Sequence, residues 1–177
     1  IRLETALTLR GYRAIQIEDL ESLISWNNWA TAAKETEELR EQSWQMGRAL
    51  IKLFLAMEPP VESNLIKELE KAVKTDSNFC NYAIAFGLAA AFWQIDLDNT
   101  VLSYLHSWAT NIINAGVKLI PLGQTQGQKL LLNLQPQILS TAQEVLQLED
   151  DELSSCSWGL SLASMVHETE YSRLFRS

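Results

Sequence analysis

The residues best suited to catalysis or metal binding are few and widely separated in this chain. Its two histidines, His106 and His167, lie far apart, and neither has a second His or Cys at ligand spacing. A metal site within the chain would therefore need ligands from several separate elements. His167 begins the sequence His-Glu-Thr-Glu, which lacks the second histidine of the zinc-protease motif His-Glu-x-x-His. We interpret His106 as a structural or surface histidine and predict no metal site.

One glycine-containing segment, Gly123–Lys129, has the composition of a phosphate-binding loop but not its spacing. Three residues separate its glycines and Leu130 follows its lysine, whereas a P-loop has four residues between the glycines and Ser or Thr after the lysine. The chain is therefore not expected to be a nucleotide hydrolase. The glutamines and Thr125 are suited to contacting a partner, but a plain surface loop with a capping threonine remains an alternative.

The other reactive groups form no recognisable catalytic set. The run Glu149–Glu152 is interpreted as a solvated acidic loop. Together with His167 it leaves open a second hypothesis, an all-α metal-binding protein or enzyme. Cys80 and Cys156 form no C-x-x-C pair and are interpreted as core or near-core thiols.

The end of the chain has the composition of a protein interface. Aromatic, aliphatic and guanidinium side chains alternate there, at Tyr171, Arg173, Leu174, Phe175 and Arg176. Such a tail either binds a partner or folds back onto its own helices.

Composition and charge favour a helical protein whose partners are not nucleic acids. The 177 residues include 14 Lys plus Arg against 22 Asp plus Glu, a net charge of −8 that opposes phosphate binding. With 47% hydrophobic and 20% charged residues, the chain can build a globular core. Only 7 glycines and 4 prolines are available for turns, which argues against a many-stranded sheet. We predict a single all-helical domain over residues 1–177.

Apolar residues recur at helical spacing along most of the chain, and the segment Tyr82–Trp93 contains no charged residue. Because a bilayer requires about 20 apolar residues, we predict no membrane span and place Tyr82–Trp93 at the centre of an all-α multi-helix bundle. Gly11 is expected to close the first helix, Asp98 or Asn99 to cap another, and Pro136 to bend or break a later one. The helices are predicted over residues 1–13, 17–33, 34–57, 64–74, 82–93, about 99–119, 128–148 and 160–168.

Three blocks of sequence together resemble the UreF family of urease accessory proteins. They are ETEELR with QMGRAL at 35–40 and 45–50, KLIPLGQTQGQ at 118–128, and the terminal HETEYSRLFRS at 167–177. The blocks occur in the order found in the family, and the ending is the most specific of them.

The resemblance implies an all-helical cytoplasmic protein that forms a homodimer and is not an enzyme. It further implies that the chain bridges the accessory protein UreD and the nickel-carrying GTPase UreG, regulates the GTPase and supports nickel delivery to apo-urease. Nickel would be the cargo of this complex, with no cofactor bound tightly, and the sequence leaves open whether nickel contacts this chain.

The resemblance also implies roles for individual residues. The family's basic residue before the Pro-Leu-Gly-Gln block, matched by Lys118, is implicated in coupling to the GTPase, and we add its neighbours Gln124, Thr125 and Gln128. The C-terminal region of the family is implicated in UreD binding, which here corresponds to residues 171–177. The family's N-terminal Ser-Tyr-Ser-type segment is missing before Ile1, so we expect the chain to lack that segment.

Overall fold

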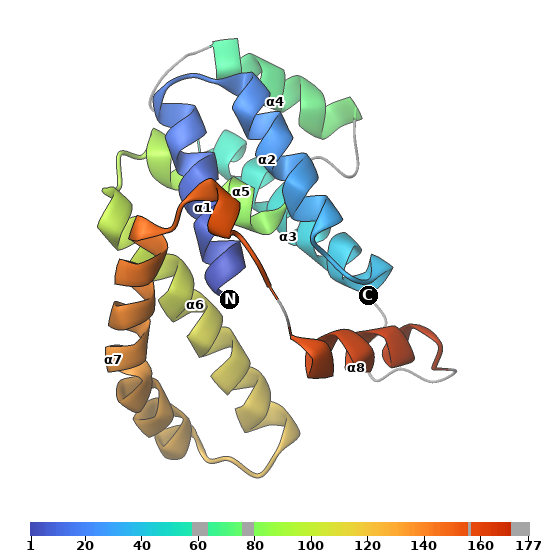
Figure 1. Ribbon diagram of the computed structural model, residues 1–177, viewed down its shortest axis with the longest axis vertical. Helices are drawn as coiled ribbons and strands as arrows, with labels where there is room; N and C mark the ends of the chain where they lie inside the picture. The colour runs from blue at the N-terminus through green and yellow to red at the C-terminus, as the bar shows by residue number, and fades with distance from the viewer. Residues whose placement is uncertain (58–63, 76–79, 156, 171–177) are drawn as a thin grey trace.

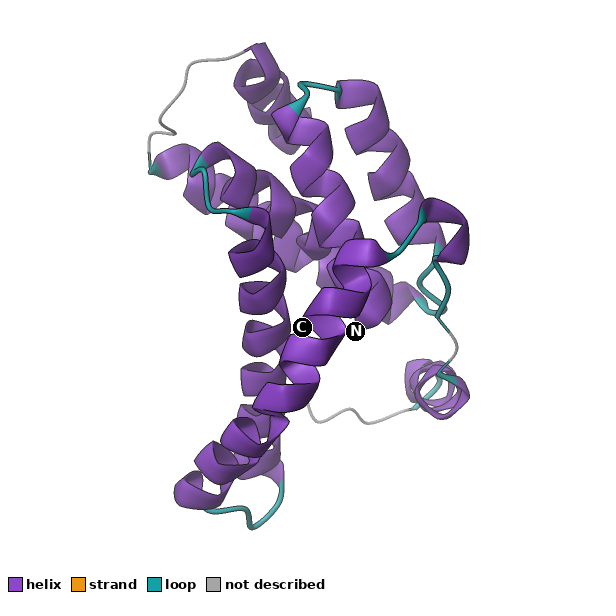
Figure 2. Ribbon diagram, turned by 60° about the vertical axis from the view of Figure 1, so that its left-hand side comes forward, coloured by secondary structure: helices purple, strands orange, loops and turns teal. Residues whose placement is uncertain are grey.

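The computed structural model describes residues 1–57, 64–75, 80–155 and 157–170 (Figure 1). These residues form eight α-helices and one short 3-10 helix, η1, and contain no strand (Figure 2). The prediction of an all-α protein is confirmed. No helix among the described residues is long and apolar enough to cross a membrane. The elements are α1 (Arg2–Gln16), α2 (Leu20–Ala32), α3 (Glu37–Ala56), α4 (Asn64–Thr75), α5 (Tyr82–Phe92), α6 (Leu97–Leu119), α7 (Gln124–Gln147), η1 (Asp150–Glu152) and α8 (Trp158–Glu168).

Helices α1 and α5 pack in close backbone contact, and glycines make this approach possible. A Cβ atom on Gly87 of α5 would lie 2.1 Å from the backbone oxygen of Thr8 on α1, so only hydrogen fits there. Gly11 of α1 likewise faces the backbone of Ile84. Our expectation that Gly11 closes the first helix is wrong, because α1 continues to Gln16. This glycine serves a close approach between backbones instead.

Helix α5 packs chiefly against α1 and α3 and also contacts α2 and α6. A helix without charged side chains can occupy such a position because it has no charge to desolvate. Most of its buried residues belong to the main apolar cluster, which includes Leu7, Ile51, Phe54 and Tyr104 and draws on the six helices α1 to α6. The buried residues of α5 are Ala83, Ile84, Ala85, Gly87, Leu88, Ala89 and Ala90.

Helices α6 and α7 form a long hairpin that packs on the rest of the protein at one end only (Figure 1). A second apolar cluster joins the near halves of both helices, and Ala109 at the start of the far half, to Ala6 and Leu9 of α1. The far half of the hairpin, residues 108–134, extends away from α1 and is called the distal hairpin below. Members of the second cluster from the hairpin are Val101, Leu105, Ala109, Ile138, Ala142 and Val145.

Two local expectations for this hairpin are wrong. Asp96, rather than Asp98 or Asn99, caps α6, because its carboxylate accepts a hydrogen bond of 2.9 Å from the backbone N–H of Asn99. Helix α7 begins at Gln124 rather than Gln128 and is continuous past Pro136. Proline removes one hydrogen bond of the helix and its ring crowds the carbonyl four residues earlier, but packing along a long helix can outweigh that cost.

Candidate partner-binding surfaces

The turn between α6 and α7 is set by a proline and a glycine. Ile120 precedes Pro121 and adopts an extended backbone (φ −126°, ψ 159°), the conformation that a following proline favours, so α6 ends at Leu119. Gly123 is the N-cap residue of α7, and its carbonyl accepts a hydrogen bond of 3.0 Å from the N–H of Gly127. The Gly123–Lys129 segment is therefore a helix start, and its interpretation as a loop is wrong.

The second glycine of this segment lets the two helices meet. A Cβ atom on Gly127 would lie 3.0 Å from Cγ2 of Val117 and 3.2 Å from Cγ2 of Ile113, both on α6. Gly127 is buried, although the residues around it on α7 are exposed. Helix capping and close packing thus explain the two glycines, and no phosphate ligand is needed to account for them.

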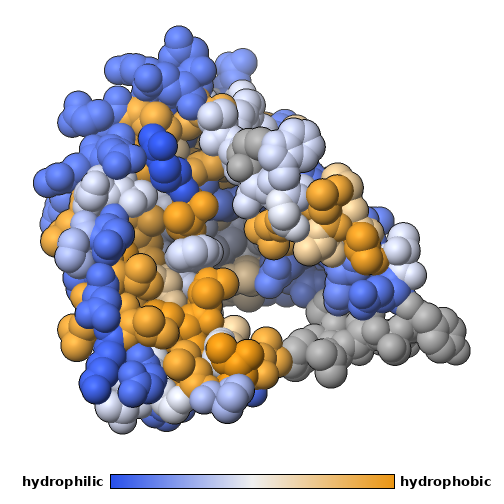
Figure 3. Space-filling view, turned by 60° about the horizontal axis from the view of Figure 1, so that its bottom comes forward, coloured by the Kyte–Doolittle hydropathy of each residue, from blue (hydrophilic) through white to orange (hydrophobic). Residues whose placement is uncertain are grey.

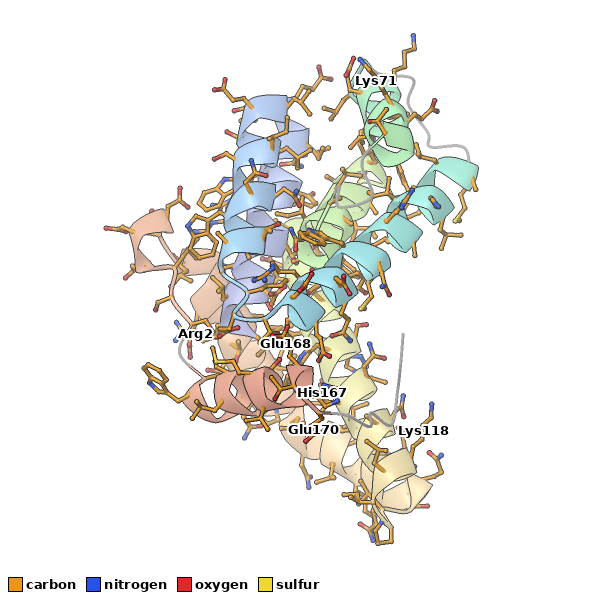
Figure 4. All side chains as sticks on the ribbon, turned by 90° about the vertical axis from the view of Figure 1, so that its right-hand side faces the viewer. Arg2, Lys71, Lys118, His167, Glu168 and Glu170 are labelled. Carbon is orange, nitrogen blue, oxygen red and sulfur yellow. The ribbon has the colours of Figure 1, made fainter. Side chains whose placement is uncertain are left out.

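The four residues proposed for GTPase coupling lie together at the end of the hairpin. Lys118 is exposed on the last turn of α6, where a cation is favoured by the helix dipole. Its side chain points away from the hairpin at the end remote from α4 (Figure 4). Gln124, Thr125 and Gln128 are exposed on the first turns of α7, at a spacing that places them on one side of the helix. We call these four residues the hairpin tip.

Apolar side chains surround the hairpin tip and remain in solvent. Leu132 is 69% exposed, and Leu119 and Ile120 are more than half exposed. Figure 3 shows apolar residues gathered over the end of the molecule that α6 and α7 form. Contiguous exposed apolar surface is typical of protein interaction sites. The exposed large apolar residues of the distal hairpin, which we call the distal apolar surface, are Trp108, Ile112, Leu119, Ile120, Leu130, Leu132 and Leu134.

His106 lies on α6 at a groove between the two hairpin helices. The groove has a volume of about 560 Å³ and is lined by hydroxyl, amide and aliphatic groups, among them Ser103, Thr110, Gln135 and Leu139. His106 is exposed, so it is a surface histidine.

The acidic residues of the alternative hypothesis are engaged in local structure. Glu149–Glu152 forms η1 with its cap rather than the expected loop, and the Glu152 carboxylate accepts a hydrogen bond of 2.9 Å from the N–H of Glu149. The carboxylate of Asp150 lies 2.9 Å from Nη2 of Arg10 on α1. His167 instead contacts α3, with Nδ1 2.7 Å from Oε2 of Glu38.

These contacts hold His167 and the acidic run in different places. Among the residues that the structure describes, no group of three or more His, Cys, Asp or Glu side chains is arranged to hold a metal ion. Burial raises the pKa of the Cys80 thiol to about 12, so this cysteine stays protonated near neutral pH. Cys156 lies outside the described residues.

Similarity to known proteins decides the family of this chain. The UreF family model matches residues 1–135. The chain is 59% identical over 177 residues to the urease accessory protein UreF of Nostoc sp., an alignment that covers 100% of this chain and 74% of that protein. It belongs to the UreF family. Proteins of the same name from Trichormus variabilis and Alkalilimnicola ehrlichii are 55% identical over 177 residues (100% of this chain, 74% of theirs) and 38% identical over 168 residues (95% and 70%).

Membership in the UreF family decides the broad class of the protein. Its relatives are named as accessory proteins of urease, a non-catalytic family, so this UreF-family chain is not itself an enzyme. The second candidate surface of the UreF-family chain is its C-terminal end. Residues Tyr171, Arg173, Leu174, Phe175 and Arg176 lie outside the described residues, and the structure describes α8 and residues 169–170, which lead to them.

One buried charged residue was not identified from the sequence of this UreF-family chain. Arg10 is 4% exposed and donates a hydrogen bond of 2.7 Å from Nη2 to the carbonyl of Leu148, in addition to its contact with Asp150. Its guanidinium also lies 5.8 Å from the ring centroid of Trp26. The only sign of this buried charge in the sequence was an arginine within an apolar run, between Leu9 and Gly11. Leu148 and Asp150, which it contacts, are far away in sequence.

Proposed function

We propose that this protein bridges UreD and the nickel-carrying GTPase UreG, regulates the GTPase and supports the delivery of nickel to apo-urease. Nickel is the cargo of the complex, and the chain itself binds no cofactor tightly. The protein works in the cytoplasm as a homodimer. The observation that carries the proposal is the juxtaposition, at one end of a UreF-family fold, of an exposed polar hairpin tip and an exposed apolar surface.

The hairpin tip is proposed to contact UreG. Lys118 is an exposed cation at a helix end, so it can pair with a carboxylate or phosphate of a partner without first leaving a buried environment. Gln124, Thr125 and Gln128 add donors and acceptors beside it. The adjacent distal apolar surface supplies the area that a few polar contacts alone would lack.

The C-terminal end is proposed to contact UreD. Tyr171, Leu174 and Phe175 supply apolar area, and Arg173 and Arg176 supply guanidinium groups, a combination enriched at interfaces. Helix α8, just before these residues, carries its own exposed apolar side chains, among them Trp158, which is 75% exposed.

Co-assembly is the direct test of the bridge. The protein would be mixed with purified UreD and UreG, and the mass of the resulting species measured by light scattering. We expect a species that contains all three chains, and a complex with UreD alone when UreG is omitted. Failure of the three proteins to co-assemble would contradict the proposal.

A substitution at Lys118 tests whether the hairpin tip contacts UreG and the C-terminal end contacts UreD. Lys118→Ala is expected to change the free energy of unfolding by less than about 0.5 kcal/mol, because the side chain is exposed. It should weaken UreG binding by about tenfold, the effect of losing one charge-assisted hydrogen bond, and lower urease activation. UreD binding should not change.

The matched control for Lys118 is Lys129→Ala, which removes an exposed lysine from α7 outside the hairpin tip. Equal losses of UreG binding in the two variants would indicate a general charge effect and would remove Lys118 from the proposed contact.

A further inference from the structure

Helix α8 turns a polar edge toward the rest of the protein and its apolar face toward solvent. Trp158, Leu162, Met165 and Val166 are 75%, 59%, 47% and 60% exposed. Their spacing places them on one face of the helix. Ser161, the buried residue of α8, lies at the edge of this face, beside Trp158 and Met165. A surface helix ordinarily has the opposite orientation, with its apolar face inward.

Two acidic residues and a histidine attach the end of α8 to the start of α3. The backbone N–H of Glu38 is one of the amides at a helix start that have no acceptor within the helix, and it donates a hydrogen bond of 3.0 Å to Oε1 of Glu168. A carboxylate at this position is also favoured by the dipole of α3. The side chain of Glu38 in turn contacts His167, with Nδ1 2.7 Å from Oε2. Figure 4 shows His167 and Glu168 beside this end of α3.

The attachment continues along the polar edge of α8. The hydroxyl groups of Ser164 and Thr36 are 2.8 Å apart, and Thr36 is the N-cap residue of α3. One turn earlier, Ser161 donates a hydrogen bond of 2.9 Å to the carboxylate of Glu35. Polar contacts therefore run along one edge of the helix at successive turns, beside the exposed apolar face.

We propose that Glu38, His167 and Glu168 form a latch that holds α8 with its apolar face outward and so positions this helix, which we call the arm, for its partner. The proposal rests on the proposed function, in which UreD binds this arm. Without the latch, the hydrophobic effect would favour rotation of α8 until its apolar face packed against its own protein. With the latch closed, a partner meets a helix that is already oriented, so less conformational freedom is lost on binding.

Hydrogen–deuterium exchange tests whether the latch holds the arm. In the double variant Glu38→Ala, Glu168→Ala we expect amide exchange over residues 158–168 to accelerate by about tenfold, with exchange in α1 and α5 unchanged. The matched control is Glu41→Ala, which removes an exposed carboxylate one turn further along α3. Unchanged exchange in α8 of the double variant would overturn the latch.

An engineered disulfide tests whether the arm binds UreD while it stays attached to α3 or must first detach from α3. Thr36→Cys with Ser164→Cys, in a Cys156→Ser background, would join two side chains that already touch. The oxidised protein should bind UreD as well as wild type and should restore binding in a Glu38→Ala background, where we expect binding to fall by about tenfold. The reduced form of each protein is its own control.

Loss of UreD binding on oxidation, with recovery on reduction, would show that the arm has to leave α3 and would overturn the proposal. Unchanged UreD binding in Glu38→Ala, despite faster exchange in α8, would overturn it as well. If the wild-type protein itself fails to bind UreD, the proposed function fails, and the exchange experiment then decides the latch by itself.

Discussion

The α1–α5 pair and the distal hairpin are both rich in apolar residues, but they use them in opposite ways. In α1, eleven of fifteen residues are buried, and Leu88 of α5 has no exposed surface. In the distal hairpin, seven large apolar residues face solvent, and Leu132 is 69% exposed. The difference shows that apolar content alone does not make a core, because burial requires a second element at close range.

Glycine position explains why one pair of helices closes completely and the other along only part of its length. Gly11 and Gly87 allow the backbones of α1 and α5 to touch, with α3 and α2 covering the remaining sides. Gly127 performs the same task for α6 and α7, but no third helix of the described residues covers the distal hairpin (Figure 1). Its apolar residues are therefore left for partners, in the function that we propose.

The largest effect should come from filling the α1–α5 contact. Gly87→Ala would place a methyl group 2.1 Å from the Thr8 oxygen, and since both groups are backbone-fixed, the helices must separate. We expect a loss of about 4 kcal/mol in the free energy of unfolding, measured by urea denaturation. The control is Gly159→Ala in α8, where a Cβ meets nothing within 4 Å. Similar losses in the free energy of unfolding at the two glycines would contradict the proposed difference in packing.

A pair of identical substitutions, one in each region, should separate stability from binding. Leu88→Ala in α5 should lower the free energy of unfolding by about 3 kcal/mol, because it leaves a cavity in a packed core. Leu132→Ala in the distal hairpin should cost less than about 0.5 kcal/mol but weaken the assembly with UreG. Urea denaturation and light scattering give the two measurements. If Leu132→Ala left assembly intact, the distal apolar surface would lose its proposed role.

The smallest effect concerns Asp96, which caps α6, the helix that packs on α1 and α5 and continues into the distal hairpin. Hydrogen bonds from Asn99 hold the pKa of this carboxyl below its usual range. Its contribution is therefore fully present above the ordinary aspartate pKa and is lost as the pH falls through the lower, folded value. Asp96→Asn keeps a capping oxygen without the titration. As the pH falls from 6 to 3, the free energy of unfolding of this variant should rise slightly relative to that of wild type, as measured by urea denaturation at each pH.

Patterns within one segment were predicted well, because their cause is local. The uncharged Tyr82–Trp93 stretch and the long amphipathic segment 34–57 appear as α5 and α3, with each end within three residues of the expected bound. The start of α7 was missed, because Gly123 and Gly127 resemble loop residues until α6 is placed against them. The contacts of Arg10 with Asp150 and of Glu38 with Glu168 could not be predicted for the same reason, since each joins residues more than a hundred positions apart.

The sequence by itself determined the helical class and the family, since composition, spacing and local motifs require no knowledge of neighbouring elements; the residues for partner contacts stay a prediction. Only the tertiary structure decided which apolar residues form the core and which remain exposed, because burial depends on which helices meet. It also decided that the polar edge of α8 faces α3. That orientation follows from hydrogen-bonding groups of two distant segments reaching one another, which no local pattern encodes.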